Sequence, residues 1–243
     1  MRSTPHLYPM KGVVAVSGRG SGEDGSRPAQ QDCMAIRDMK TAETYVQWLR
    51  GFDPSVLQTR HSRLAFWINT YNMLTIHAVQ KNLEENPDFT QRGHKNIFQR
   101  IKFFWSTKHV IGGKQFSLYQ IENGILRKMN EPRIHFALNC ASASCPVLKD
   151  GLYSEESLER ELEAAASAFI QSSLGIVIEK GNMTVRLSRI FKWYKKDFKR
   201  AAGSVLEYVK GYLQEGDRAF IDSYISNISI HYMEYDWALH TTH

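Results

Sequence analysis

One segment of the sequence, residues 62–82, is apolar on nearly every side of the helix that it predicts. Its apolar residues do not gather on a single face; they are Leu64, Ala65, Phe66, Trp67, Ile68, Met73, Leu74, Ile76, Ala78 and Val79. A helix without a clear polar face is normally buried on most of its sides. We therefore expect this helix to lie inside the molecule, with other elements packed around it.

Capping residues and the spacing of apolar residues predict further helices before and after this segment. The first of them ends at Gly51, which is the usual type of residue at a helix C-terminus. Ser117, with Gln120 three residues later, forms a capping box that opens another helix. Ser154 and Ser188 are expected to cap two later helices.

Short strands are predicted between the helices. Residues 110–116 and 176–187 each indicate a hairpin with a glycine-containing turn, and residues 225–232 indicate a last strand. Residues 133–140 alternate in character and predict an internal strand. Because helices dominate and the strands are short, the predicted fold class is α+β: a single mixed domain, helix-rich, with a small central sheet.

The beginning of the chain differs from the remainder in composition. Residues 1–32 are rich in Gly, Ser, Pro and Gln and have no apolar period, so they predict a disordered tail. Residues 33–243 contain no repeat and no internal boundary, which indicates a single globular domain.

Composition and charge exclude several classes of protein. The net charge of +6 is spread along the chain, so it favours nucleic acid only weakly. No apolar run approaches the roughly 20 residues of a membrane-spanning helix. Three cysteines are too few for a disulfide framework, and the N-terminal apolar run is too short for a secretory signal. The simplest prediction is a cytoplasmic protein without membrane contact or cofactor.

In the predicted strand, alternate side chains share one face. Arg133, His135 and Asn139 would then lie on a polar face, while Cys140 would lie on the apolar face as a buried thiol. Buried polar groups need partners, so the polar face is expected to line a cleft or a hydrogen-bond network.

The loop after this strand contains small residues that include Ser144, so a ligand can approach its backbone closely. Cys145 precedes Pro146, a good first residue of a helical turn, and a thiol at a helix N-terminus has a lowered pKa. Cys145 as nucleophile, with His135 as base and Asn139 as orienting group, would form a Cys–His site. Two structural thiols and a structural histidine remain the alternative. The spacing of Cys140 and Cys145 is not that of a C-x-x-C motif, and a zinc site would need further ligands.

Four other polar residues are candidates for the site or its support. Asn69 and Asn72 lie three apart on one face of the apolar helix, where they would either brace a loop or line a pocket. Glu122 would pair with Arg133 or orient His135. Asp236, in the aromatic C-terminal run, would cap or pair there.

With these segments described, the chain resembles the domain-of-unknown-function 547 family over about residues 60–240. The motifs that carry the resemblance are residues 64–72 (LAFWINTYN), 116–118 with 121–122 and 125–127, 133–140 (RIHFALNC), 144–146 (SCP), 188 with 190–191, 193–194, 197–198 and 235–237 (YDW). The resemblance implies a shared domain and no known reaction. Two positions depart from the family pattern: Asn123 stands where a histidine is usual, and His240 where an asparagine is usual. If that histidine takes part in activity, this chain would be weakly active or inactive.

Three hypotheses of function follow. The first is a thiol-dependent hydrolase or acyl-transferase, with Cys145 as nucleophile, His135 as base, Glu122 or Asn139 as orienting group and loop amides as the oxyanion site. The second is a module without catalysis, whose groove binds a protein, peptide or small-molecule ligand. The third is a thiol-redox protein.

Overall fold

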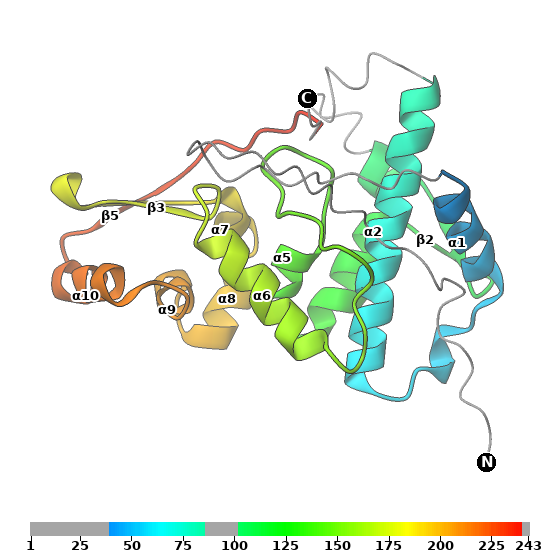
Figure 1. Ribbon diagram of the computed structural model, residues 1–243, viewed down its shortest axis with the longest axis horizontal. Coiled ribbons are helices and arrows are strands. Elements are labelled where there is room, and N and C mark those ends of the chain that lie inside the picture. Colours follow the sequence, from blue (N-terminus) through cyan, green and yellow to red (C-terminus); the bar gives the residue numbers. More distant parts are fainter. Residues whose placement is uncertain (1–38, 86–101, 240–243) are drawn as a thin grey trace, which may run out of the picture.

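The structure is a computed structural model that describes residues 39–85 and 102–239 (Figure 1). The expected N-terminal tail, residues 1–32, and His240 lie outside the described residues. The helices are α1 (Met39–Gly51), α2 (Arg60–Glu85), α5 (Ile134–Ala137), α6 (Leu158–Ile170), α7 (Arg189–Trp193), α8 (Lys195–Ala202), α9 (Val205–Lys210) and α10 (Glu215–Tyr224). The 3-10 turns are η1 (Pro54–Val56), η4 (Arg127–Met129) and η5 (Lys180–Asn182), and the π-helical turns are η2 (Lys102–Ser106) and η3 (Gln120–Leu126). The strands are β1 (His109–Ile111), β2 (Lys114–Phe116), β3 (Ile176–Glu179), β4 (Thr184–Leu187) and β5 (Ser229–Tyr232).

Helix α2 is the centre of one half of the molecule, as its apolar sequence predicts. Every residue from Leu64 to Ile76 is buried. In Figure 1, α1 and β2 lie on one side of α2, and α5 and α6 lie on the other. The surrounding elements bury all faces of this segment, which explains why it needs no polar side.

The predicted hairpins and capping box are present. Strands β1 and β2 pair antiparallel across Gly112 and Gly113, which both have a positive φ. The amide of Ser117 donates to Gln120 Oε1 at 2.9 Å, and the amide of Gln120 donates to Ser117 Oγ at 3.2 Å. The helix that follows is π-helical in η3, with a wider turn than an α-helix.

The remaining strands form a second sheet, at the left end of the molecule in Figure 1. Its order is β3-β4-β5, with β3 and β4 antiparallel and β4 and β5 parallel. Helices α7 to α10 connect the parallel strands β4 and β5. An α+β fold with short strands is therefore confirmed, and the described strands are divided between two small sheets.

The prediction of a strand over residues 133–140 is wrong. Residues Ile134–Ala137 form the single-turn helix α5, in which the amide of Leu138 donates to the carbonyl of Ile134 at 2.9 Å. Pro132 fits the first turn of a helix, and Glu131 Oε1 accepts the amide of Arg133 at 3.2 Å. All four residues of this turn are buried, so the alternation of polar and apolar residues does not correspond to one buried and one exposed face of a strand.

Two hydrophobic clusters meet at α5. Ile134 and Ala137 belong to the cluster around α1 and α2, whereas Phe136 belongs to the cluster of α7, α8 and the second sheet. The ring of Phe136 packs on Phe169, Phe191, Phe198 and Tyr208. The polar side chain of His135 is thereby buried between two apolar clusters.

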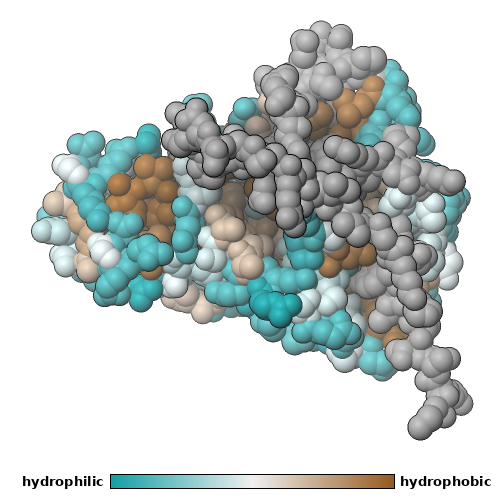
Figure 2. Space-filling view, in the orientation of Figure 1, coloured by the Kyte–Doolittle hydropathy of each residue, from teal (hydrophilic) through white to brown (hydrophobic). Residues whose placement is uncertain are grey.

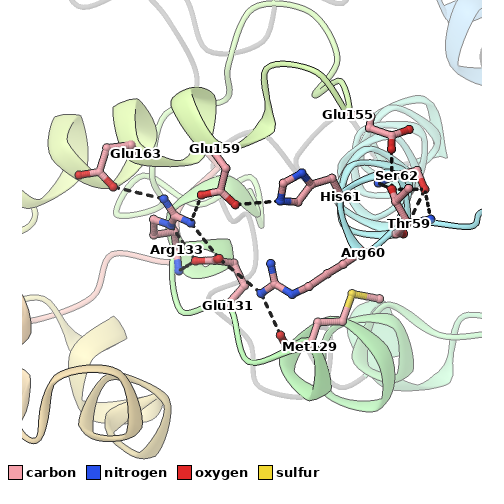
Figure 3. Close-up of polar contacts among 10 residues, drawn as sticks. All are labelled: Thr59, Arg60, His61, Ser62, Met129, Glu131, Arg133, Glu155, Glu159 and Glu163. Carbon is pink, nitrogen blue, oxygen red and sulfur yellow. Dashed lines mark hydrogen bonds and ion pairs between the residues drawn. The ribbon is translucent and has the colours of Figure 1, made fainter.

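Ion pairs join the start of α5 to α2 and α6 (Figure 3). The guanidinium of Arg133 contacts Glu131 at 2.7 Å and Glu159 at 2.6 Å, and Glu163 at 3.3 Å. Arg60 at the start of α2 reaches the same Glu131 at 3.5 Å. This network fixes the turn that positions His135.

The surface is mostly polar, with hydrophobic patches in several places (Figure 2). One patch lies at the left end of the view, over the part formed by the second sheet and α10. Among the described residues, no helix is both long and apolar enough to cross a membrane.

Candidate functional site

The loop after α5 brings two thiols together. The sulfur atoms of Cys140 and Cys145 lie 2.7 Å apart, and the amide of Cys140 donates to Cys145 Sγ at 2.9 Å. The chain reverses between them through Ala141, which has a φ of 62°, and the amide of Cys145 closes the turn on the carbonyl of Ser142. Positive φ is uncommon for alanine, so this loop adopts a constrained conformation that holds the two sulfur atoms close.

Three asparagines brace the backbone around this loop. Asn139 accepts the amide of Ala141 at 2.6 Å and donates to the carbonyl of Pro146 at 2.7 Å. Asn72 donates to the carbonyl of Ala137 and accepts the amide of Asn139, both at 2.9 Å. Asn69 makes a similar pair of hydrogen bonds with the backbone of Tyr153. The side-chain amides of these asparagines therefore hold the loop and its neighbours. The side-chain hydrogen bonds of Asn139 go to the backbone, and His135 is bonded to Asp197 instead.

The C-terminal segment completes the loop from the other side. Ser144 and Asp236 exchange hydrogen bonds, since the amide of Ser144 reaches the carbonyl of Asp236 and the amide of Asp236 reaches Ser144 Oγ. The carboxylate of Asp236 accepts the amide of Ala238 at 2.8 Å. These contacts place the hydroxyl of Tyr235 at 3.4 Å from Cys140 Sγ.

The neighbours of Cys140 make it the more acidic thiol. Hydrogen bonds from Cys145, Ser142 and Tyr235 lower the pKa of Cys140 to about 7, although burial acts in the opposite direction. Burial raises the pKa of Cys145 well above its usual value, and the neighbouring Cys140 raises it further. The first proton of the pair is therefore lost more easily than that of a free thiol, and the surrounding donors favour Cys140 as the sulfur that carries the charge.

His135 is held by a carboxylate that the sequence analysis did not select. Its Nε2 atom lies 3.0 Å from Asp197, and Arg127 Nε contacts the same carboxylate oxygen at 2.7 Å. Although burial acts against it, the hydrogen bonds from His135 and Arg127 hold the pKa of Asp197 well below its usual range. Burial lowers the pKa of His135. A neutral imidazole then donates from Nε2 to Asp197, and Nδ1 is its basic nitrogen.

Tyr194 connects this histidine to the other groups of the site. Its ring stacks on the imidazole of His135 with 3.7 Å between centroids, and its hydroxyl donates to Glu122. Burial raises the pKa of Tyr194, and the charges of Glu122 and Cys140 raise it further. Tyr194 is thus a protonated neighbour of both the acidic thiol and the imidazole. Of the two alternatives expected for Glu122, the pairing with Arg133 is wrong, because the described partners of that arginine are Glu131, Glu159 and Glu163. The carboxylate that contacts His135 is that of Asp197.

Both thiols, His135, Glu122, Tyr194 and Tyr235 border one cavity of about 480 Å³. The residues that line it come from α2, the π-helical turns η2 and η3, the loop after α5, α7 and the C-terminal segment; they are Tyr71, Phe104, Trp105, Tyr119, Glu122, Asn123, His135, Leu138, Cys140, Cys145, Pro146, Ile190, Trp193, Tyr194, Tyr235 and Trp237. Single turns of π-helix occur frequently at functional sites, and here one such turn supplies Glu122 and Asn123. The volume is within the range of small-molecule sites.

The structure brings together three of the groups that the sequence analysis selected for catalysis, Cys145, His135 and Glu122, and adds Cys140 to the same cavity lining. It places Asn69, Asn72, Asn139, Ser144 and Asp236 in backbone hydrogen bonds, and Arg133 in the network of Figure 3. The prediction that Cys140 is a thiol of the apolar face is wrong, because it followed from the strand that α5 replaces.

Asp197, Tyr194 and Tyr235 are the residues that sequence reasoning missed. A signal was present for the first of them. Asp197 lies beside Phe198 and three residues after Tyr194, so a carboxylate falls on the buried face of that helix. A buried carboxylate needs a partner, which identifies it as a candidate to hold a histidine. Tyr235 gave no such signal, because its contact with Cys140 depends on the tertiary fold.

The described residues contain no group of three or more His, Cys, Asp and Glu side chains that could hold a metal ion. The chemistry that the arrangement itself supports is nucleophilic: an acidic thiol, a second thiol that donates to it, and an imidazole bound to a carboxylate, all at one aromatic cavity.

Fold and site define an α+β protein with a thiol pair in an aromatic cavity. Residues 54–170 match the model of a family described as "Protein of unknown function, DUF547". The matched range includes both thiols, His135 and Glu122, and ends before Asp197 and Tyr235. Comparisons with curated proteins and with solved structures each find no match.

The family departure at Asn123 falls inside the site. Asn123 lines the cavity, and its Oδ1 atom accepts a hydrogen bond from Arg127 at 2.6 Å. In this chain Asn123 therefore supports the arginine that holds Asp197, and the imidazole of the cavity is that of His135.

Proposed function

We propose that the protein is a thiol-dependent enzyme that hydrolyses or transfers an acyl group in the aromatic cavity, with Cys140 as its nucleophile. The observation that carries the proposal is the surroundings of Cys140, whose sulfur lies at the cavity within 2.7 Å of Cys145 and 3.0 Å of Ser142. These contacts favour a thiolate near neutral pH, and the thiolate is the nucleophilic form of cysteine.

The first step would form a thioester. The thiolate of Cys140 attacks the carbonyl carbon of the substrate, and the bond to the leaving group breaks. Cys145, which is protonated before the reaction, gives its proton to the leaving group and becomes a thiolate. The loop amides are poor candidates for an oxyanion site, because those of Ala143, Ser144 and Cys145 already donate within the protein. Tyr71 is a better candidate for the oxyanion donor. It lines the cavity, and burial raises the pKa of its hydroxyl group, so the hydroxyl keeps the proton that it would donate to the oxyanion.

The second step would release the acyl group. His135, neutral and oriented by Asp197, accepts a proton from water or from an acceptor hydroxyl through Nδ1. The oxygen of that molecule attacks the thioester, and Cys140 leaves as a thiolate. The proton taken up by His135 then returns to the thiolate of Cys145, which restores the starting state. General-base catalysis by histidine needs one ring nitrogen held by an acceptor and the other basic; here the carboxylate is on Nε2 and Nδ1 is basic, the reverse of the Ser-His-Asp triad.

Acyl labelling tests the proposal. The purified protein is mixed with p-nitrophenyl acetate and with an acyl thioester, and mass spectrometry of peptides follows the acetyl group. We expect the acyl group on Cys140, and a loss of turnover of at least about 100-fold in Cys140→Ser, with no effect of Cys33→Ser as the matched thiol control. Turnover that survives in Cys140→Ser, or an acyl group that appears only on other residues, would show that this proposal is wrong.

A binding module without catalysis is the second candidate, and the exposed aromatic rings at the cavity favour it. Trp105, Trp193 and Tyr119 are 55%, 43% and 40% exposed although they line the cavity. Exposed aromatic side chains in a patch mark binding sites. If Cys140→Ser and His135→Ala bind a ligand as tightly as the original protein, and no acyl transfer is found, this second function is supported instead.

A further inference from the structure

The two thiols are arranged for a reaction with each other as well as with a substrate. Bonded sulfur atoms lie about 2.05 Å apart, so the sulfur atoms of Cys140 and Cys145 need to approach by only roughly 0.7 Å. The loop between them is held by Asn139 and by the carbonyl of Asp236, so a closed disulfide needs no large change in the chain.

The two thiols also differ in access. Both thiols line the cavity, but Cys140 is partly exposed, while Cys145 is only 5% exposed. Cys140 is therefore the more accessible thiol, and Cys145 lies 2.7 Å from it, where its sulfur can attack whatever forms on Cys140. An accessible thiolate next to a second thiol is the arrangement found where thiols are oxidised reversibly.

We propose that Cys140 and Cys145 reduce an organic hydroperoxide in this cavity and close to a disulfide. In the first step the thiolate of Cys140 attacks the terminal oxygen, the O–O bond breaks, and the alcohol leaves after it takes up a proton. Cys140 is then a sulfenic acid. In the second step the sulfur of Cys145 attacks that of Cys140, the S–O bond breaks, and water leaves with the proton of Cys145. Two thiols are oxidised, and one hydroperoxide becomes one alcohol and one water.

The walls of the cavity favour an organic hydroperoxide over hydrogen peroxide. Eight of the lining residues carry phenyl, phenol or indole rings, so an apolar group attached to the peroxide would be removed from water. Tyr235, which contacts Cys140 Sγ, is a hydroxyl donor near the breaking O–O bond. This activity uses the thiols of the proposed acyl-transfer site but does not require that acyl transfer takes place.

A single-turnover experiment tests it. The reduced full-length chain is mixed with one equivalent of cumene hydroperoxide, and alcohol formation and a Cys140–Cys145 disulfide are followed by chromatography and peptide mass spectrometry. We expect one alcohol per chain, a disulfide that dithiothreitol reverses, and a rate at least about tenfold above that with hydrogen peroxide. Cys33→Ser is the matched control and should behave like the original protein.

Variants separate the steps. Cys145→Ser should leave a sulfenic acid on Cys140 that dimedone traps, and Cys140→Ser should consume no hydroperoxide faster than the unfolded chain does. The original protein alone can also overturn the inference. It does so if the reduced, folded protein reacts with cumene hydroperoxide no faster than the chain unfolded in urea, or if the disulfide that forms includes Cys33. Acyl labelling of Cys140 in the same preparation reports on the proposed function separately, because the reduced thiolate is sufficient for it.

Discussion

At the scale of single residues, the charge of Cys140 depends on three groups that approach its sulfur. Cys145 and Ser142 are close in sequence, whereas the hydroxyl of Tyr235 comes from 95 positions later. The hydroxyl of Ser142 donates to the oxygen of Tyr235 at 3.0 Å, so this tyrosine can direct its own proton toward the sulfur, and the backbone amide of Ser142 is then the donor of that residue to Cys140. Each donor that faces the thiolate lowers the pKa of the thiol.

Removal of one of these donors should therefore raise the pKa of Cys140. The lowered pKa predicts that alkylation of Cys140 by iodoacetamide reaches half its maximal rate near pH 7, below the value of about 8.5 for a free thiol. In Tyr235→Phe we expect this midpoint to move upward by about half a unit or more, with Tyr224→Phe, an exposed tyrosine, unchanged. Site-resolved mass spectrometry measures both thiols. A midpoint that is the same in both variants contradicts the role of Tyr235.

The carboxylate of Asp197 is the second residue whose ionisation matters. Because its pKa is lowered in the folded protein, its stabilising effect is present above the unfolded value of about 3.9 and is lost as the pH falls through the folded value. Asp197→Asn should lower the free energy of unfolding by about 3 kcal/mol at pH 7, since it leaves Arg127 and His135 without their anion. Urea unfolding at pH 7 and near pH 3 measures this.

The exposed Asp150 supplies the matched control for that experiment. Asp150→Asn should change the free energy of unfolding by less than about 0.5 kcal/mol. The difference between Asp197→Asn and the original protein should shrink at the acidic pH. An equal difference at both pH values would mean that ionisation of Asp197 is not what stabilises the fold.

At the scale of elements, the parts that local sequence signals determine were predictable, and those that tertiary contacts determine were not. The capping box of Ser117 and Gln120 and both hairpins need only neighbouring residues, and each is present. Helix α5 was not recognised, because it is only one turn long and all of its residues are buried, so the alternation that predicted a strand does not separate a buried face from an exposed one. The faces assigned to Arg133 and Cys140 followed from that error.

The network of Arg133 shows why α5 takes its position. Glu131 is 6% exposed, and although burial raises it, the hydrogen bonds and charge of Arg133 lower the pKa of this carboxyl group. Arg133→Met would leave a buried carboxylate with only Arg60 beside it. We expect a loss of about 3 kcal/mol in the free energy of unfolding, measured by urea titration.

Two further variants give that prediction its control. Arg160→Met, at an exposed arginine of α6, should cost less than about 0.5 kcal/mol. The double variant Glu131→Gln with Arg133→Met should recover part of the loss, because no buried charge then lacks its partner. If the double variant is as unstable as the sum of the single variants, the loss comes from packing of the arginine side chain and not from the ion pair.

At the scale of the whole molecule, the cavity differs in charge from the chain that surrounds it. The chain carries 31 Lys and Arg residues against 25 Asp and Glu residues, yet none of the described lining residues is Lys or Arg. The lining contains one carboxylate, Glu122, the acidic thiol of Cys140 and eight aromatic rings. No sequence pattern indicates this contrast, because the lining residues extend from Tyr71 to Trp237 along the chain.

This contrast predicts which ligands the cavity prefers. Aromatic faces and a nearby negative charge attract organic cations, by about 0.5–2 kcal/mol where the site is partly removed from water. Choline should therefore bind more tightly than its neutral isostere 3,3-dimethylbutanol, by roughly threefold to thirtyfold, because only the ammonium group is attracted by the aromatic rings and the carboxylate.

Tryptophan fluorescence reports binding, since Trp105, Trp193 and Trp237 line the cavity. Glu122→Gln should reduce the preference, while Glu234→Gln, at an exposed position outside the lining, should not. Equal affinity for the two isosteres would mean that shape and apolar area, and not charge, select the ligand.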